Sequence, residues 1–334
     1  MILVTGGTGL VGSHLLYKLA LQNNSIKAIY RKSSNLLAVK KVFSYYSDDY
    51  EALFNKIDWV AADLLDVTTL KNAFENVTKV YHCAALVSFN PKDYWKMRKI
   101  NIEGTANVVN FCIDAKIDKL CFVSSIATLD KSVDSDIINE ESEWISTRNK
   151  SGYAITKHGA EIEVWRASQE GVNVVIVNPG VILGAGFWDN GTGELFSKIA
   201  KGFNFYSEGV TGFVSVNDVV KIMIALMDSS VINEQFVLVA ENLSFKTIFY
   251  EIAKAFGKKP PRIKVNKFRS SIVWRVATFW AFITNKNPIL TKNSAKSLHT
   301  KSYYSSDKII KTLNFKFEKI TSVIRTICTF YNQK

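Results

Sequence analysis

The chain of 334 residues has little cysteine, and its few cysteines follow no motif. None of the four forms a CxxC pair, and their spacing matches neither a metal site nor a disulfide framework, so no metal is predicted. Cys83 and Cys121 lie in apolar runs and are expected to be buried free thiols. The sequence also lacks low-complexity stretches and repeats, and its composition is that of an ordinary globular protein.

A hydrophobic run long enough to span a membrane is also missing. The most apolar segment, 272–283, is about 12 residues long and contains Arg275, whereas a span needs roughly 20 residues. We interpret this segment as an amphipathic helix that closes a pocket, with peripheral membrane contact as the alternative. Because the first four residues already resemble a core strand, no signal peptide is expected, and the protein is predicted to be cytoplasmic.

The sequence has fewer acidic than basic residues, and its formal net charge is +12 at pH 7. Such a balance is compatible with nucleic acid, anionic lipid or a phosphorylated ligand. The lysines are, however, scattered along the whole sequence, and no nucleic-acid-binding motif is present. We therefore expect a solvated basic surface, no nucleic-acid partner, and one anionic cofactor as the specific partner.

The first half of the chain alternates between strand-like and helical segments. The expected strands are the apolar runs 2–4, 26–30, 58–61, 79–83, 119–124 and 172–177. Helical patterns occupy 11–22, 68–75, 93–115 and 153–170. This alternation predicts an α/β fold of the Rossmann type, a doubly wound parallel sheet with helices on both faces.

The regular alternation ends after Asn178-Pro179-Gly180. Further on, helical runs are expected at 217–228, 244–256 and 268–283, with a short strand at 235–239. We predict a dinucleotide-binding domain over 1–180 whose sheet is completed by 213–240, with Phe213 to Val216 returning to it. Residues 181–334 are predicted to form a smaller, mostly helical part that binds the substrate.

A glycine-rich loop follows the first strand and leads into a helix, in the order Thr5-Gly6-Gly7-Thr8-Gly9-Leu10-Val11-Gly12. Such glycines permit a tight turn, a close approach to a pyrophosphate and close packing of helix on strand, and the helix N-terminus attracts phosphate. Two registers are open, since Gly7, Gly9 and Gly12 give GxGxxG, whereas Gly6, Gly9 and Gly12 give GxxGxxG.

The loop after the second strand contains Arg31 and Lys32 and no carboxylate. An acidic residue at this place usually binds the ribose 2′-OH of NAD, whereas a cation accommodates the 2′-phosphate of NADP. The sequence therefore favours NADP over NAD.

Tyr153 and Lys157 begin the helical run that starts near residue 153, and their i, i+4 spacing places them on one helix face. Carbonyl reduction needs a proton donor at the oxygen, and a nearby ammonium is expected to lower the tyrosine pKa from its usual value of about 10. The pair lies one strand downstream of Ser124 and Ser125. Either serine hydroxyl stands where a parallel sheet binds its ligand and can hold a substrate oxygen.

Six segments appear in an order that resembles the extended short-chain dehydrogenases/reductases of the NAD(P)-dependent epimerase/dehydratase group. They are TGGTGLVG, YHCAALVSF, NIEGTANVV, FVSSIAT, YAITK and NPGVILG, and they cover roughly residues 1–230. The resemblance implies a catalytic triad of Ser125, Tyr153 and Lys157, with Ser124 as the alternative serine. It also implies that the phosphate loop uses Gly6, Gly9 and Gly12.

The same resemblance implies the remaining cofactor contacts. Asp63 would contact the adenine, with Leu64 beside it, and Ala84 and Ala85 would line the cofactor after the fourth strand. Asn101 corresponds to an asparagine that supports the active site, and it is counted among the cofactor-binding residues. The full predicted set is Gly6, Thr8, Gly9, Leu10, Val11, Gly12, Arg31, Lys32, Asp63, Leu64, Ala84, Ala85, Asn101, Tyr153, Lys157 and Pro179.

The two residues after the serines indicate the branch of the family. Dehydratases place an acidic pair there, whereas this chain has Ile126 and Ala127, which argues against acid/base elimination. The sequence looks more similar to the dihydroflavonol-reductase-like and hydroxysteroid-dehydrogenase-like branches, which act on bulky apolar molecules. Five aromatic residues could form such a pocket, although core positions are the more common role: Phe89, Phe187, Trp188, Trp274 and Trp280.

The leading hypothesis is therefore an NADP-dependent reductase or dehydrogenase acting on a carbonyl or alcohol of a small apolar substrate. The first alternative is a nucleotide-sugar epimerase, which would use the same triad and hold NAD tightly. The second is a cofactor-sensing protein without turnover. The resemblance also implies a homodimer in which the helices at 93–115 and 153–170 pair across a two-fold axis.

Overall fold

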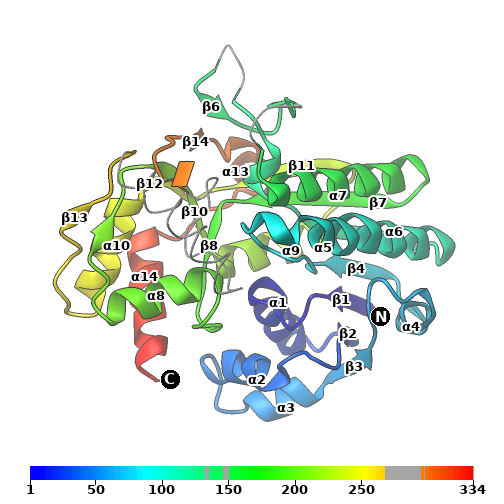
Figure 1. Cartoon of the computed structure of the whole chain (residues 1–334). Coiled ribbons are helices and arrows are strands. Elements are labelled where there is room, and N and C mark those ends of the chain that lie inside the picture. Colours follow the sequence, from blue (N-terminus) through cyan, green and yellow to red (C-terminus); the bar gives the residue numbers. More distant parts are fainter. Residues whose placement is uncertain (132–134, 146–149, 268–294, 297, 334) are drawn as a thin grey trace.

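The computed structural model describes residues 1–131, 135–145, 150–267, 295–296 and 298–333. Its main sheet has seven parallel strands in the order β11-β7-β5-β4-β1-β2-β3. The predicted doubly wound Rossmann-type sheet is thus confirmed (Figure 1). The strands are β1 (Ile2–Thr5), β2 (Ile26–Tyr30), β3 (Ile57–Ala61), β4 (Lys79–His82), β5 (Lys119–Val123), β7 (Asn173–Pro179) and β11 (Glu234–Leu238).

Helices cover both faces of this sheet because alternate strand residues are apolar on both sides. Val4 packs with one set of helices, and its neighbour Leu3 packs with the other. The first set is α1 (Leu10–Leu21), α2 (Leu36–Ser44), α3 (Tyr50–Asn55) and α9 (Val216–Asp228). The second set is α4 (Val67–Ala73), α6 (Gly104–Asp114) and α7 (Gly152–Gln169), with α5 (Tyr94–Arg98) leading into α6.

The helical run predicted over 93–115 is interrupted rather than uniform. A π-helical turn over Lys99–Glu103 separates α5 from α6. Such turns insert one extra residue into a helix and are frequent at functional sites. Here the turn places Asn101 in the interior, where it is fully buried.

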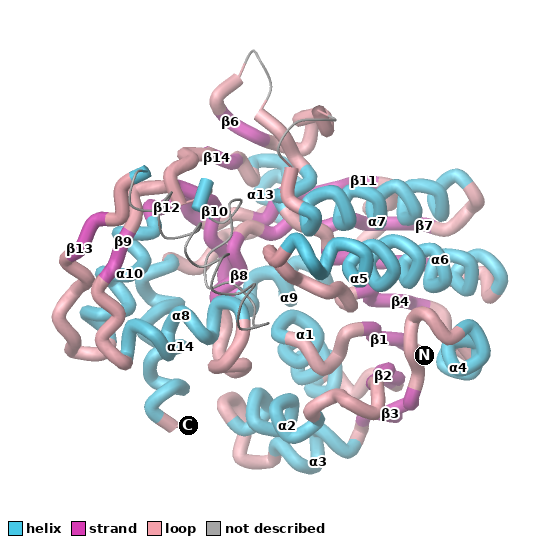
Figure 2. The backbone as a smooth tube through the Cα atoms, in the orientation of Figure 1, coloured by secondary structure: helices cyan, strands magenta, loops and turns pink. Residues whose placement is uncertain are grey.

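Apart from α9 and β11, most elements beyond Gly180 form a second, smaller group (Figure 2). Its three-stranded sheet has the order β12-β10-β8, formed by Glu241–Ser244, Val210–Ser215 and Val181–Leu183. Around it pack α8 (Gly191–Ala200), α10 (Phe245–Ala255) and α14 (Ile320–Asn332). Short strands complete this part: β9 (Phe205–Tyr206), β13 (Ile263–Lys264) and β14 (Tyr303–Tyr304), with β14 paired to β6 (Ile137–Ile138). Helix α13 (Asp307–Leu313) instead packs on β11, and its Ile309 belongs to the core of the main sheet.

The prediction that Phe213 to Val216 returns to the main sheet was wrong. Phe213, Val214 and Ser215 pair with β8, and the main sheet instead ends at β11, which pairs with β7. Glycine at position 180 permits the chain to pass close to β10, since a Cβ on Gly180 would lie 2.5 Å from the carbonyl oxygen of Gly212. The predicted helix 268–283 and the apolar segment 272–283 lie outside the described residues. No helix among those residues is long and apolar enough to cross a membrane.

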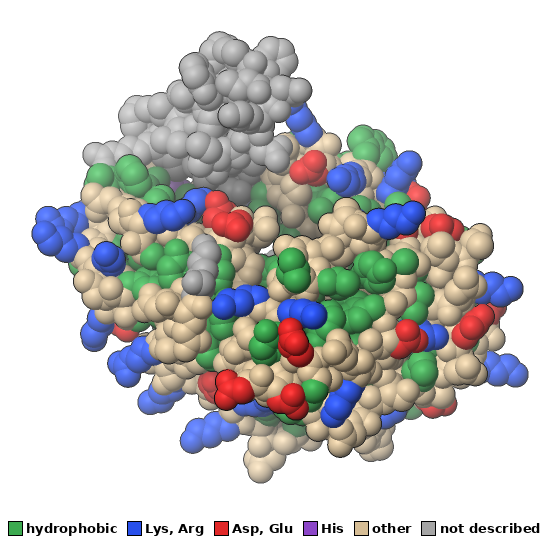
Figure 3. Space-filling view, turned by 90° about the horizontal axis from the view of Figure 1, so that it is seen from below, with side chains coloured by type: hydrophobic (Ala, Val, Ile, Leu, Met, Phe, Trp, Pro, Cys, Tyr) green, Lys and Arg blue, Asp and Glu red, His purple; other side chains and the backbone are tan. Residues whose placement is uncertain are grey.

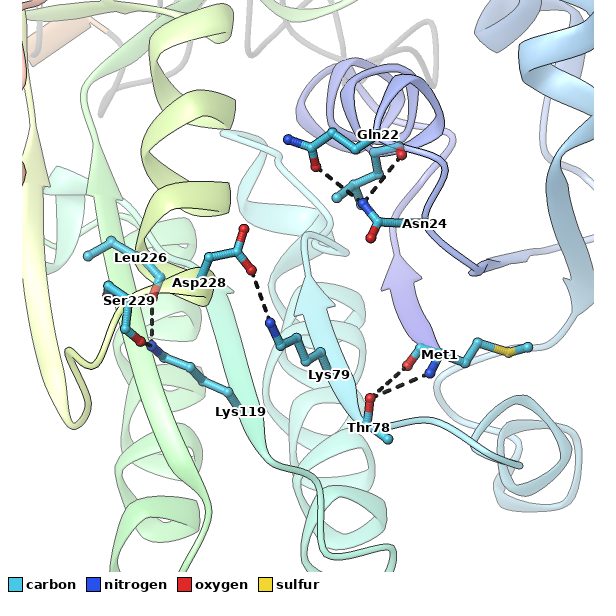
Figure 4. A network of polar contacts seen from close by, with 10 residues as sticks. Met1, Gln22, Asn24, Thr78, Lys79, Lys119, Leu226, Asp228 and Ser229 are labelled. Carbon is cyan, nitrogen blue, oxygen red and sulfur yellow. Dashed lines mark hydrogen bonds and ion pairs between the residues drawn. The ribbon is translucent and has the colours of Figure 1, made fainter.

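Several lysines have structural roles at the edge of the sheet where the strands begin (Figure 4). The buried Lys119 donates to the carbonyl oxygens of Leu226 and Ser229 at the end of α9, at 2.5 and 2.9 Å. Lys79 pairs with Asp228 at 3.0 Å. Because the last carbonyls of a helix lack partners and carry negative charge, these cations stabilise the end of α9. Part of the basic excess therefore stabilises the fold.

The remaining charges do not gather on the face shown in Figure 3. Lysine and arginine side chains are spread over that face, with acidic side chains between them. Hydrophobic side chains occupy much of the area between the charges. This face thus carries dispersed basic residues, without a continuous basic patch.

Candidate active site

The candidate site lies at the carboxyl ends of the central strands. The glycine loop follows β1, Cys83 to Ala85 follow β4, Ser124 and Ser125 follow β5, and Gly180 follows β7. Since the strand order reverses between β4 and β1, these loops border the crevice in which open parallel sheets bind their ligands.

The glycine loop has a geometry that only glycine allows at two positions. Gly6 has a φ of +69°, and a Cβ there would lie 2.5 Å from the amide nitrogen of Ala84. A Cβ on Gly12 would lie 2.2 Å from the carbonyl oxygen of Gly6. A Cβ on Gly7 would meet only the flexible end of Leu16, at 2.7 Å. The backbone therefore requires glycine at Gly6 and Gly12, which favours the Gly6, Gly9, Gly12 register, and Gly9 is the N-cap of α1.

The start of α1 suits a pyrophosphate. Gly9 has no side chain to cap the helix, and the first turn contains no acidic residue. The N–H groups of Leu10, Val11 and Gly12 are thus not bonded by a capping side chain, and the helix dipole adds positive potential. Thr8 is fixed beside this turn, where its hydroxyl contacts Ser34 Oγ at 3.5 Å. These residues fit the phosphates of a dinucleotide.

The loop after β2 presents two free cations. Arg31 and Lys32 are exposed, and neither forms a salt bridge within the described part of the chain. The loop itself is ordered by Ser34, whose Oγ accepts from the Arg31 amide at 3.1 Å and whose amide donates to the Arg31 carbonyl at 2.8 Å. Through Thr8, Ser34 also connects this loop to the glycine loop.

The predicted cofactor residues after β3 and β4 stand at the carboxyl ends of those strands. Asp63 is half-buried and accepts from the Leu65 amide at 2.9 Å, while the side chain of Leu64 is buried against Gly104. The Ala84 amide donates to the Thr5 hydroxyl at 3.3 Å, directly below Gly6. Ala85 follows in the same loop, and Pro179 is buried at the end of β7.

Asn101 supports the loop after β4 through hydrogen bonds, and its place among the cofactor-binding residues stays a prediction. It is fully buried, and both polar atoms of its side chain are engaged by protein groups. Its Oδ1 accepts from the Leu86 amide at 2.7 Å, and its Nδ2 contacts the Leu86 carbonyl at 3.0 Å and the Thr156 hydroxyl at 3.1 Å. Asn101 therefore joins the loop after β4 to α7 and supports the site from behind.

Helix α7 carries the Tyr153 and Lys157 side chains to the site. Ser151 caps it by accepting from the Ala154 amide at 3.1 Å, so Tyr153 stands in the first turn. The Ser125 hydroxyl lies near the Tyr153 phenol and lowers the pKa of that phenol. Ser124 instead points into the core, where its buried Oγ finds no partner among the described residues. Of the two serines, the structure brings Ser125 to the tyrosine.

The electrostatics differ from the expectation that Lys157 lowers the pKa of Tyr153. Burial raises the pKa of the Tyr153 phenol, the nearby Ser125 hydroxyl opposes this rise, and the Glu161 carboxylate adds to it. The Lys157 ammonium instead donates to the Val123 carbonyl at 2.7 Å and lies 4.1 Å from the Phe122 ring centroid. Burial lowers the pKa of Lys157 to about 8, against the opposing effect of Glu161.

Sequence reasoning missed three polar residues behind this site, namely Thr128, Glu161 and Asn178. All are buried, and both Thr128 and Asn178 donate to Glu161, at 2.9 and 2.6 Å. The spacing of Tyr153, Lys157 and Glu161 by four residues was the one available signal. It places the carboxylate on the same face of α7.

The aromatic residues suggested for a substrate pocket separate into two groups. Phe89 is about half exposed, at 52%, and its ring centroid lies 6.0 Å from that of Tyr153 in an edge-to-face arrangement. Phe187 is half-buried in a left-handed backbone conformation with a φ of +53°. Trp188 is a core residue whose Nε1 donates to the Tyr45 hydroxyl at 2.9 Å. Trp274 and Trp280 lie outside the described residues.

A protein-family model with the description "Male sterility protein", for an NAD-binding family, matches residues 4–246, more than two thirds of the chain. The chain belongs to this family, within the extended short-chain dehydrogenases/reductases. One relative, a Synechocystis sp. protein named after dihydroflavonol 4-reductase, is 26% identical over 96% of this chain and 91% of that protein. Another, the UDP-glucose 4-epimerase of Vibrio cholerae, is 27% identical over 77% of this chain and 76% of that protein.

Solved structures of the family agree with this membership. The crystal structure of gox2253 is 25% identical to this extended short-chain dehydrogenase/reductase, with a TM-score of 0.81 over 100% of this chain and 98% of that one. Since the relatives are NAD(P)-dependent reductases and epimerases, this chain is an NAD(P)-dependent enzyme of the oxidoreductase type.

Proposed function

We propose that this enzyme is an NADP-dependent reductase that converts a carbonyl on an apolar substrate into an alcohol. The observation that carries the proposal is the placement of Tyr153 and Lys157 on α7 beside the end of β5, where Lys157 bonds the Val123 carbonyl two residues before Ser125. The cofactor, when bound, would supply hydride to the carbonyl carbon. The residues of this chain would bind the reactants and provide the proton.

Tyr153 is proposed as the proton donor. Because burial raises its pKa, its phenol is protonated at neutral pH, which suits protonation of a carbonyl oxygen during reduction. Ser125, whose hydroxyl lies near the phenol, would hold the same oxygen. Lys157 is proposed to bind the cofactor ribose and to add positive charge near the phenolate that proton donation leaves.

The choice of NADP over NAD rests on Arg31 and Lys32. Both are exposed at the end of β2, where the ribose 2′-position is recognised in this fold. Their lack of salt bridges within the described part of the chain leaves both side chains free to bind a 2′-phosphate. Asp63, after β3, is the nearest predicted partner of the adenine.

The substrate is proposed to be apolar because of the loop that follows β4. Val87 and Phe89 are 59% and 52% exposed, and Phe89 stands against Tyr153. Hydrogen bonds within the loop hold it in place: Ser88 Oγ donates to Asp93 at 2.6 Å and accepts from the Asn90 amide at 3.1 Å. A fixed loop that exposes apolar side chains beside the proposed proton donor favours an apolar partner.

A substrate panel tests this function against the epimerase alternative. The wild-type enzyme is expected to oxidise NADPH with aryl or alkyl aldehydes and ketones, and more slowly with polyhydroxylated carbonyl compounds of similar size. Consumption of NADPH, followed by absorbance, is the measurement. Isomerisation of a nucleotide sugar without added NADPH, by an enzyme that carries tightly bound NAD, would contradict the proposal and support the epimerase.

We also propose a homodimer formed through α5, α6 and α7. On α7, Ile155 and Ile162 are seven residues apart on one face and are 38% and 55% exposed, and Trp95 on α5 is 69% exposed. The wild-type chain is expected to show twice its mass of 37.5 kDa by light scattering. Ile162→Asp should shift this mass toward that of the monomer. A monomeric wild type would contradict the proposal.

A further inference from the structure

A buried carboxylate lies behind the proposed reaction centre, and within the described part of the chain it has no lysine or arginine partner. Glu161 is 5% exposed and follows Lys157 by one turn of α7 and Tyr153 by two. The Lys157 ammonium is bonded to the Val123 carbonyl, and His158 Nδ1 is 3.9 Å from the carboxylate. Since a buried carboxylate is costly unless hydrogen bonds satisfy it, its partners show what the fold gains from it.

Those partners are two neutral side chains from other elements. Asn178, on β7, donates its Nδ2 to Glu161 Oε1 at 2.6 Å, and the Thr128 hydroxyl lies 2.9 Å from the same oxygen. The amide of Asn178 must present its nitrogen here, because its oxygen would repel the carboxylate. This orientation leaves Asn178 Oδ1 buried without a partner among the described residues, a cost that the short bond to Glu161 must offset.

Both partners also bond the main chain of Ser125. The Thr128 hydroxyl has one hydrogen, which it shares between the Ser125 carbonyl oxygen and Glu161 Oε1, both at 2.9 Å. Asn178 Nδ2 has two hydrogens and lies 3.3 Å from the same carbonyl oxygen. Ser125 begins the 3₁₀ turn Ile126–Thr128, and its Oγ accepts from the Ala127 amide at 3.1 Å. The turn after Ser125 is thereby tied to Glu161, on the helix that also carries Tyr153.

We propose that Glu161 is a positioning residue that, through Thr128 and Asn178, fixes the Ser125 turn to α7 and so holds the Ser125 hydroxyl against Tyr153. The inference rests on the function proposed above for Ser125 and Tyr153. The sign of its charge supports positioning, since the carboxylate makes the Tyr153 phenolate less favourable. A group that acted on proton transfer mainly through its charge would be expected to have the opposite sign.

Four variants test the inference with the substrate that wild type reduces. Thr128→Val removes the hydroxyl at nearly constant shape, and kcat is expected to fall about 10–100-fold, with an unchanged KM for NADPH. Thr128→Ser keeps the hydroxyl, and its kcat should stay within about threefold of the wild-type value. Glu161→Gln keeps an acceptor oxygen and should remain within about fivefold, whereas Glu161→Leu should fall about 10–100-fold.

The matched control is Glu163→Gln, which removes a carboxylate from the same helix. Glu163 pairs with Arg166 at 3.0 Å and, among the described residues, has no contact with the Ser125 turn, so wild-type kcat is expected. Three results would overturn the inference. They are a wild-type kcat in Thr128→Val, a kcat in Thr128→Ser as low as in Thr128→Val, and an equal loss of kcat in Glu161→Gln and Glu161→Leu. Full activity of Tyr153→Phe would instead overturn the proposed function.

Discussion

Replacing Tyr153 by phenylalanine is expected to lower kcat about 10²–10⁴-fold, the usual contribution of a general acid. The change removes only the phenolic oxygen, which lies near Ser125, and leaves a ring that packs edge-to-face on Phe89. The affinity for NADPH should stay within roughly twofold, because the glycine loop is untouched. Steady-state kinetics and cofactor titration by fluorescence measure the two effects separately.

The two serines provide the matched control for this prediction. Ser125→Ala should lower kcat, since the hydroxyl lies near Tyr153, whereas Ser124→Ala should leave it near wild type, because its Oγ has no partner among the described residues. If Ser124→Ala lost activity and Ser125→Ala retained it, the wrong serine would have been assigned to the site.

Replacing both Arg31 and Lys32 by alanine is expected to raise the KM for NADPH about 10–100-fold. Hydrogen bonds to charged groups contribute about 1.5–3 kcal/mol each, and exposure of these side chains favours the lower part of that range. The KM for NADH should change less than about threefold, because NADH has no 2′-phosphate. Initial rates at varied concentrations of each cofactor give both values.

Lys71→Ala serves as the control, since Lys71 is an exposed lysine on α4 and its loss changes the net charge without touching the loop after β2. A wild-type enzyme that prefers NADH would contradict the choice of NADP. A double variant with an unchanged KM for NADPH would show that Arg31 and Lys32 do not bind the 2′-phosphate. The membership in the family and the proposed proton donor would not be affected by either result.

The parallel sheet was predictable because its strands are apolar on both faces and are separated by helical patterns. Helices α2 and α3 were missed, since only a few of their residues reach the core, such as Val39, Phe43 and Phe54. The position of β10 was also not predictable. In its pairing with β8, the chain at Gly180 passes close to Gly212, and these two glycines are distant in sequence.

For the site, spacing and order located Tyr153, Lys157 and the serines, but not how these groups affect each other. Spacing placed the Lys157 ammonium near the phenol, whereas the fold directs it to the carbonyl of Val123. Burial raises the pKa of Tyr153, whereas the sequence predicted that Lys157 would lower it. Such effects depend on which groups the fold buries together, and no local pattern in the sequence records them.

The proposed role of Tyr153 as the source of the proton in carbonyl reduction can be tested in a single turnover. Enzyme saturated with NADPH is mixed rapidly with the best substrate of the panel, for wild type and for Tyr153→Phe. We expect rapid loss of NADPH absorbance in wild type and a loss about 10²–10⁴-fold slower in the variant. Equal single-turnover rates in the two proteins would contradict this role.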